Sequence, residues 1–154
     1  MCDIHEFKLD EILIGKSIPP PPPEDNIGEV ARLSFIVTKS MHDSFTKITG
    51  DISPVHLSAE YAKEKGFKDV LVYGMLTASF YSTLVGVFLP GKYAIFQKCE
   101  VSFNKPVYIG DTLSLSGTIS DIHYALKRIT IKAAIRNQYK EKVSSATLIV
   151  GITE

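Results

Sequence analysis

Residues 73–89 read YGMLTASFYSTLVGVFL, and in a helical conformation this stretch places apolar side chains on almost every face. A helix that spans a membrane needs about 20 such residues. This stretch is shorter, and it contains four serine and threonine side chains, those of Thr77, Ser79, Ser82 and Thr83. We therefore expect a helix that is surrounded by protein on all sides, rather than one that crosses a membrane.

Pro90 and Gly91 end this helix. After them, the spacing of the apolar residues changes from that of a helix to every second residue. Leu113, Leu115 and Ile119 alternate with polar side chains, as in a strand with one buried face. Similar alternation, or an apolar run of strand length, predicts four long strands after the helix: Ala94–Phe103, Leu113–Ser120, Ile129–Arg136 and Ala146–Ile152.

Shorter elements precede the long helix. Gly50 and Gly66 each stand where a glycine commonly ends a helix, and Ser58 stands where a serine commonly begins one. The segment between the two short helices is expected to be a loop. The expected elements are a strand over Arg32–Val37 and helices over Met41–Ile48 and Ala59–Lys65.

These elements predict an α+β protein in which a curved antiparallel sheet of about five strands wraps a long central helix. This arrangement is the hot-dog fold. A single curved sheet cannot cover every side of an apolar helix, and the edge strands of the sheet remain unpaired. Pairing of two subunits edge to edge would supply the missing cover, so we expect a homodimer or an oligomer built from dimers.

The composition fits one such domain. The chain has 154 residues, of which 45% are hydrophobic, and 17 basic residues balance 17 acidic ones. Without a surplus of positive charge, a general nucleic-acid binder is not expected.

We assign residues 1–29 to an N-terminal extension and residues 30–154 to the domain. The extension contains Pro19–Pro23, which favours a polyproline spacer, with a ligand for SH3-type partners as the alternative.

Cys2 and Cys99 occur in no disulfide or metal-binding spacing, which is typical of a reducing compartment. The N-terminus lacks the pattern of a signal peptide, so we expect a cytoplasmic protein without a membrane partner. His5, His42 and His123 lie in unrelated segments, and a metal site is therefore not predicted. A Ser/His/Asp triad is equally unsupported, because no G-x-S-x-G sequence occurs.

The stretch Phe45–Ala62, FTKITGDISPVHLSAEYA, holds the strongest candidates for chemistry. Gly50 and Pro54 favour an irregular backbone that presents Asp51 and His56 on one loop. A carboxylate and an imidazole held together can share one water: the carboxylate takes a proton from it, and the imidazole orients the water or relays protons. The alternative is structural: Asp51 caps a turn, and His56 is a partly buried histidine with satisfied hydrogen bonds.

A second candidate is Gly74, at the start of the long helix. The first N–H groups of a helix have no acceptor within it, and the helix dipole favours negative charge there. The N–H of Gly74 could therefore stabilise an oxyanion, and the missing side chain would let a ligand approach. The alternative is that glycine only eases the start of the helix against the sheet.

Three segments, in order, resemble the MaoC-like dehydratases and (R)-specific enoyl-CoA hydratases, and the likeness covers roughly residues 30–152. The first is the hydratase 2 motif, Gly-Asp-x-Asn-Pro-aliphatic-His, in which Ser53 stands here in place of Asn. The second is the family's helix start, I-V-H-G-M-L, in which Tyr73 replaces His. The third, Phe103–Leu113, resembles F-x-x-P-V-x-x-G-D-x-L.

The resemblance implies reversible hydration of trans-2-enoyl thioesters to (R)-3-hydroxyacyl thioesters by a hydro-lyase that needs no metal or redox cofactor. The substrate would be a thioester of coenzyme A or acyl carrier protein. Asp51 and His56 would activate the water, and the N–H of Gly74 would bind the thioester carbonyl. The implied substrate contacts are Ser53, Tyr73, Met75 and Ser82, and an apolar pocket is expected along the helix near Met75, Phe80 and Leu84.

Two other functions remain open at this stage. A hot-dog thioesterase would use a carboxylate near the helix to direct water at the thioester carbonyl and would release a free thiol. A non-catalytic subunit that binds acyl thioesters is the alternative of a different class, and the replacement of Asn by Ser53 keeps it in consideration.

Overall fold

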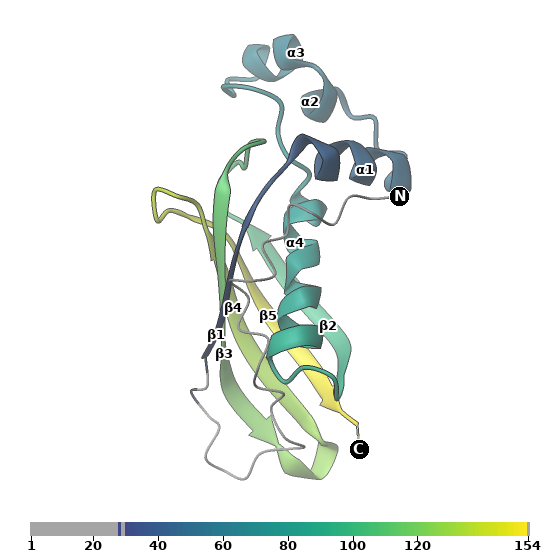
Figure 1. The fold of residues 1–154 in the computed structure, drawn as a ribbon, viewed down its shortest axis with the longest axis vertical. Helices are drawn as coiled ribbons and strands as arrows, with labels where there is room; N and C mark the ends of the chain where they lie inside the picture. Colours follow the sequence, from purple (N-terminus) through teal and green to yellow (C-terminus); the bar gives the residue numbers. More distant parts are fainter. Residues whose placement is uncertain (1–27, 29, 154) are drawn as a thin grey trace.

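A computed structural model describes Gly28 and residues 30–153. The predicted extension, with its proline run, lies outside the described residues apart from Gly28. Five strands form one antiparallel sheet in the order β1-β3-β4-β5-β2. Figure 1 shows the sheet curving along the central helix. The strands are β1 (Val30–Ile36), β2 (Ala94–Phe103), β3 (Thr112–His123), β4 (Arg128–Arg136) and β5 (Lys142–Ile152).

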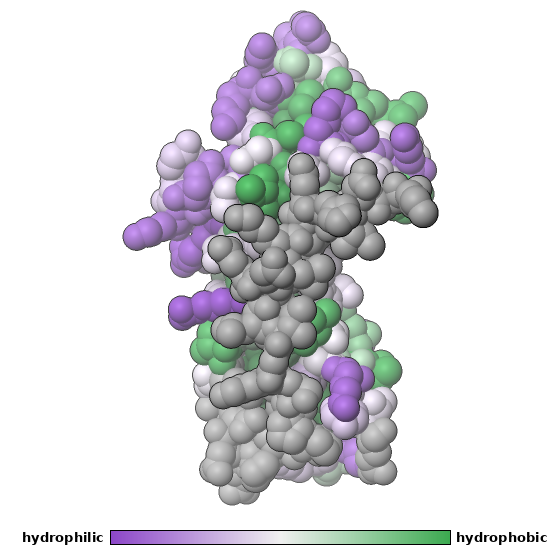
Figure 2. Space-filling model, in the orientation of Figure 1, coloured by the Kyte–Doolittle hydropathy of each residue, from purple (hydrophilic) through white to green (hydrophobic). Residues whose placement is uncertain are grey.

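The central helix consists of α4 (Gly74–Thr83), which continues as a π-helical turn, η4 (Leu84–Phe88). The α+β fold predicted from the sequence is thus confirmed. The other helices of the described chain are short: α1 (Lys39–Thr49), α2 (Pro54–Leu57), α3 (Ala59–Glu64) and the 3-10 turn η5 (Tyr124–Leu126). In Figure 1, α1, α2 and α3 gather at the N-terminal end of α4. On the face that Figure 2 shows, hydrophilic and hydrophobic residues are interspersed over this group.

Local signals set the ends of the short helices. Gly50 has a left-handed backbone, with φ of +69°, and its N–H donates to the Thr46 carbonyl to close α1. The Ser58 hydroxyl accepts the N–H of Tyr61 at 3.2 Å and caps α3. The segment between the predicted helices is not wholly a loop, since Pro54 begins the four-residue helix α2 at a position where proline needs no N–H acceptor.

Strand β5 begins earlier than the sequence pattern predicted. The expected start was Ala146, but the strand runs from Lys142. Ser144 is fully buried there, and its hydroxyl lies 2.9 Å from the hydroxyl of Tyr81 on α4. The hydrogen bond satisfies two buried polar groups, so a serine can occupy a core position that its polarity had seemed to exclude.

A row of small side chains crosses the middle of the sheet. Ala31 pairs with Gly117, Gly117 with Ala133, and Ala133 with Ala146. A Cβ atom added to Gly117 would lie 2.5 Å from Cδ2 of Leu84, which is fully buried. The small row therefore lets the central helix approach the sheet more closely than ordinary side chains would allow.

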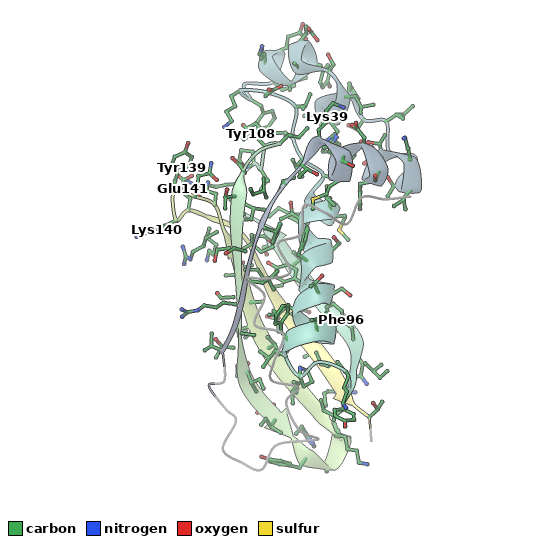
Figure 3. The ribbon with its side chains drawn as sticks, in the orientation of Figure 1. Lys39, Phe96, Tyr108, Tyr139, Lys140 and Glu141 are labelled. Atoms are coloured by element: carbon green, nitrogen blue, oxygen red, sulfur yellow. The ribbon has the colours of Figure 1, made fainter. Side chains whose placement is uncertain are left out.

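Apolar packing on both sides of this row completes the core. Phe80 of α4 stacks on Phe35 of β1 with ring centroids 3.6 Å apart. Phe96 of β2, labelled in Figure 3, packs against the same core from the opposite edge of the sheet. No helix in the described part of the chain is long and apolar enough to cross a membrane.

The close contact predicts the effect of adding one methyl group. Gly117→Ala should lower the free energy of unfolding by roughly 1–3 kcal/mol, because the new Cβ must displace Leu84 or the strand. Gly86→Ala is the matched control: nothing lies within 4 Å of its added Cβ, so its stability should not fall. Urea denaturation followed by circular dichroism measures the stability of both variants. Equal stability of the two would contradict the inference that Gly117 is needed for the close approach of the helix to the sheet.

Candidate active site

A cavity of about 400 Å³ lies at the N-terminal end of α4. Among the candidate residues it is lined by His56 from α2 and Gly74 from α4. Its other walls come from the segment before α4, from α4 itself, from the end of β2 and the loop after it, and from the start of β5. These walls are formed by Phe67, Leu71, Val72, Thr77, Phe103, Asn104, Lys105, Pro106, Val107 and Val143.

His56 is half-buried, and its hydrogen bond fixes its tautomer. Nδ1 lies 2.7 Å from the backbone carbonyl oxygen of Leu71. Because a carbonyl oxygen can only accept, Nδ1 carries the proton, and in the neutral ring Nε2 is the free acceptor. Leu71 is itself held, since its N–H donates to the Val55 carbonyl at 3.0 Å. The backbone therefore orients the imidazole so that one basic nitrogen is available for chemistry.

Asp51 lies on the exposed loop between α1 and α2. Its Oδ1 accepts the N–H of Ser53 at 3.0 Å, which forms a local turn. In the described part of the chain, the other carboxylate oxygen has no protein partner. The structure thus contains the turn that the structural alternative predicted, and it also leaves one oxygen of Asp51 available to accept a proton.

Tyr73 contacts both the Asp51 loop and His56. It is only 2% exposed, and its hydroxyl donates to the backbone carbonyl of Asp51 at 2.7 Å. The same hydroxyl lies 2.8 Å from Oγ1 of Thr46 on α1, and the Tyr73 ring packs on the ring of His56 with centroids 4.1 Å apart. Tyr73 does not line the cavity. It instead links α1, the Asp51 loop and His56 into one unit.

His42 belongs to the same assembly, which sequence reasoning did not detect. It is 3% exposed on α1, and its Nε2 lies 3.3 Å from the Leu71 carbonyl that also accepts from His56. Burial lowers the pKa of His42, so the neutral form is favoured. In the sequence, the only indication of this role was that His42 precedes Thr46 by four residues, which places both on one face of the helix. His42 therefore acts as a neutral donor that helps hold the Leu71 carbonyl.

Asp51 is not among the residues that line the cavity, and the remaining predicted residues do not line it either. Ser53 is half-buried on the Asp51 loop, whereas Met75, at 60% exposed, and Ser82 lie on the outer side of α4. Phe80 and Leu84 are in the core against the sheet, so they do not form the expected acyl pocket. The helix meets the cavity only near its start, because the sheet occupies the side on which these two residues lie.

Gly74 is at the first position of α4, where glycine permits a close contact. A Cβ atom here would lie 3.1 Å from the ring of Phe103 at the end of β2. The Gly74 N–H is one of the helix donors that have no carbonyl acceptor within the helix. Gly74 and His56 line the same cavity, so a backbone N–H and an imidazole can reach one small ligand. No group of three or more potential metal ligands occurs among the described residues.

A helix held in a five-stranded antiparallel sheet defines a hot-dog protein, and His56 and the first residue of the helix line one cavity. Comparison with known families agrees. Residues 25–143 match the MaoC-like domain, and the chain belongs to this family. The recognition made from the three sequence motifs is therefore confirmed.

Individual relatives are hydratases and dehydratases. The (R)-specific enoyl-CoA hydratase of Rhodospirillum rubrum is 32% identical over 105 residues, which are 68% of this chain and 73% of the relative. The mitochondrial 3-hydroxyacyl-[acyl-carrier-protein] dehydratase FERN of Solanum lycopersicum is 37% identical over 101 residues, 66% of this chain and 54% of the relative. The solved (R)-hydratase of A. caviae aligns with a TM-score of 0.80 at 27% identity, covering 86% of this chain and 100% of that one. These relatives are hydro-lyases, the class of enzyme that the sequence predicted.

The contacts of Tyr73 predict the effect of removing its hydroxyl. Tyr73→Phe should lower the free energy of unfolding by about 1 kcal/mol, because the Asp51 carbonyl and Thr46 lose a partner inside the protein. Tyr139→Phe is the control, since Tyr139 is 71% exposed, and its stability should not change. Urea denaturation compares the two, and a stability of Tyr73→Phe equal to that of the control would show that the hydroxyl link contributes nothing.

Proposed function

We propose that the chain hydrates trans-2-enoyl thioesters reversibly to (R)-3-hydroxyacyl thioesters, with Asp51 and His56 activating the water. The observation that supports this proposal most directly is the arrangement of His56. Its Nδ1–H is committed to the Leu71 carbonyl, and it lines a cavity that also receives the start of α4. Addition of water to a conjugated thioester needs a base for the water and a donor for the carbonyl oxygen, and the cavity offers candidates for both.

In the proposed reaction, one water donates hydrogen bonds to the free oxygen of Asp51 and to Nε2 of His56. Its oxygen then attacks C3 of the enoyl group, and the π electrons move toward the thioester carbonyl. The Asp51/His56 pair takes one proton from the water and returns a proton to C2 on the same face, so one water is added in total. Positioned proton transfer of this kind typically accelerates a reaction by about 10²- to 10⁴-fold.

The carbonyl oxygen gains negative charge as the water adds. The N–H of Gly74 is suited to stabilise that charge, because it lies at the positive end of α4 and lines the cavity. Phe67, Val72 and Val143 give the cavity an apolar wall for an acyl chain. Lys105 also lines the cavity, and its ammonium is paired with the carboxylate of Glu141. Relatives that act on coenzyme A thioesters and on acyl-carrier-protein thioesters both occur, so either carrier fits the proposal. Ser53 lies on the Asp51 loop and is proposed to help place the water.

The catalytic pair can be tested with conservative variants. Asp51→Asn and His56→Gln should each lower kcat for crotonyl-CoA by at least about 10²-fold while the far-UV circular dichroism spectrum is unchanged. Asp69→Asn and His123→Gln are matched controls, because Asp69 also accepts a neighbouring N–H and His123 also caps a turn, and both should keep the wild-type rate.

The assay follows the loss of enoyl absorbance for substrates of graded chain length and checks the chirality of the product. Wild-type rates in both pair variants would rule out the assignment. Release of free thiol would instead indicate a thioesterase, and saturable binding of acyl-CoA without any turnover would indicate a non-catalytic subunit.

We also propose that the working unit is a homodimer formed through strand β2. This strand pairs only with β5, so its other edge offers free backbone donors and acceptors. It carries exposed apolar side chains, with Ile95 at 53% and Phe103 at 50% exposed. Phe103 also lines the cavity, which places the proposed interface beside the active site.

The dimer proposal predicts a mass of twice the 17.0 kDa of one chain by light scattering after size exclusion. Ile95→Glu should shift the protein toward the monomer, because it places a charge on the proposed interface. Tyr139→Glu, at a more exposed aromatic residue between β4 and β5 (Figure 3), should leave the mass unchanged. A wild-type mass of one chain would contradict the proposal.

A further inference from the structure

Thr77 presents a polar group that nothing in the described protein satisfies. The residue is 3% exposed on α4, one turn after the helix start. Its Oγ1 is buried and has no hydrogen-bond partner among the described residues. A buried hydroxyl without a partner is unfavourable, because it has lost its hydrogen bonds to water, and such groups in folded proteins call for an explanation. Valine, which has the same shape, would avoid this cost.

The position of Thr77 indicates where a partner would come from. Thr77 lines the same cavity as His56 and Gly74. On a helix, residues three apart lie on one face, and side chains tilt toward the N-terminus. The Thr77 side chain therefore leans over Gly74, which has no side chain of its own to cover it. The Thr77 hydroxyl and the Gly74 N–H are thus neighbouring donors at the end of α4.

From this arrangement we infer that the hydroxyl of Thr77 donates a hydrogen bond to the thioester carbonyl oxygen of the substrate, as a second donor beside the N–H of Gly74. The inference rests on the proposed function for the identity of the ligand. The hydroxyl would contribute most in the enolate-like transition state, because a donor fixed in a buried site interacts more strongly as the oxygen becomes negative. The substrate carbonyl then supplies the acceptor that the described residues do not.

The isosteric variant Thr77→Val separates this role from a structural one. It removes an unsatisfied buried hydroxyl, so its melting temperature should equal or exceed that of the wild type. Its kcat for crotonyl-CoA should nevertheless fall by at least about tenfold, since single oxyanion donors typically contribute about 10²- to 10³-fold. Thr77→Ser keeps a hydroxyl and should lose far less. Thr83→Val, the same change on the same helix outside the cavity, should leave kcat unchanged.

A spectroscopic readout tests the contact without turnover. Infrared difference spectra of butyryl-CoA labelled with ¹³C at the carbonyl report the hydrogen bonds to that oxygen, because each donor lowers the stretching frequency. The band should move to higher frequency in Thr77→Val than in the wild type and remain low in Thr77→Ser. An unchanged band in Thr77→Val would overturn the inference, including the case in which turnover slows because the hydroxyl holds the water instead.

The outcomes also distinguish this inference from the proposed function. A wild-type protein that binds butyryl-CoA with a lowered carbonyl band, but hydrates no enoyl thioester, would refute the hydratase and leave the Thr77 contact supported if the band shifts in Thr77→Val. Normal hydration by Thr77→Val, with an unchanged band, would refute the contact and leave the hydratase standing. Failure of the wild type to bind any acyl thioester would overturn the inference.

Discussion

Burial of the central helix is the constraint on which the rest of the structure depends. Because α4 and η4 are apolar on nearly every side, the sheet must approach them closely and curve around them. The approach is possible where Gly117 gives Leu84 room, in a row that also includes Ala31, Ala133 and Ala146. A larger side chain in that row would move the helix away from the sheet, and the start of α4 would then move away from the loop that holds Asp51.

The site uses the one end of the helix that the sheet does not enclose. There the backbone of Leu71 and Val72 runs between the short helices and the sheet, with hydrogen bonds to Val55 on one side and Val107 on the other. Tyr73 follows directly and links the Asp51 loop to α1. Asp51 and His56, the proposed catalytic pair, are therefore exposed and half-buried groups, whereas backbone carbonyls and the buried ring of Tyr73 contact them.

Much of this arrangement was predictable from the sequence, because the strongest signals are local and periodic. Strand β2 was predicted to the residue, since Pro90 and Gly91 separate it from the helix and its apolar run is continuous. The start of β5 was missed because Ser144 is polar, and its buried partner Tyr81 is distant in the sequence. Helix α2 was missed because four residues give no measurable period.

The candidate site was only partly predictable for the same reason. The motifs indicated His56 and Gly74, which the structure brings to one cavity. The walls were missed because Phe67 and Val143 come from segments that no sequence spacing connects. Met75 was expected to contact the substrate but faces outward, because helix periodicity cannot say which side of an apolar helix meets a cavity.

The hydrogen bond from His56 to the carbonyl of Leu71 has an evolutionary consequence. The Leu71 residue lines the cavity, whereas its backbone oxygen orients the imidazole. Any amino acid at this position supplies the same carbonyl, so drift at this site can reshape the pocket for a different acyl group without releasing the base. Substitutions at this one position can thus change the substrate range while the hydrogen bond that orients His56 is kept.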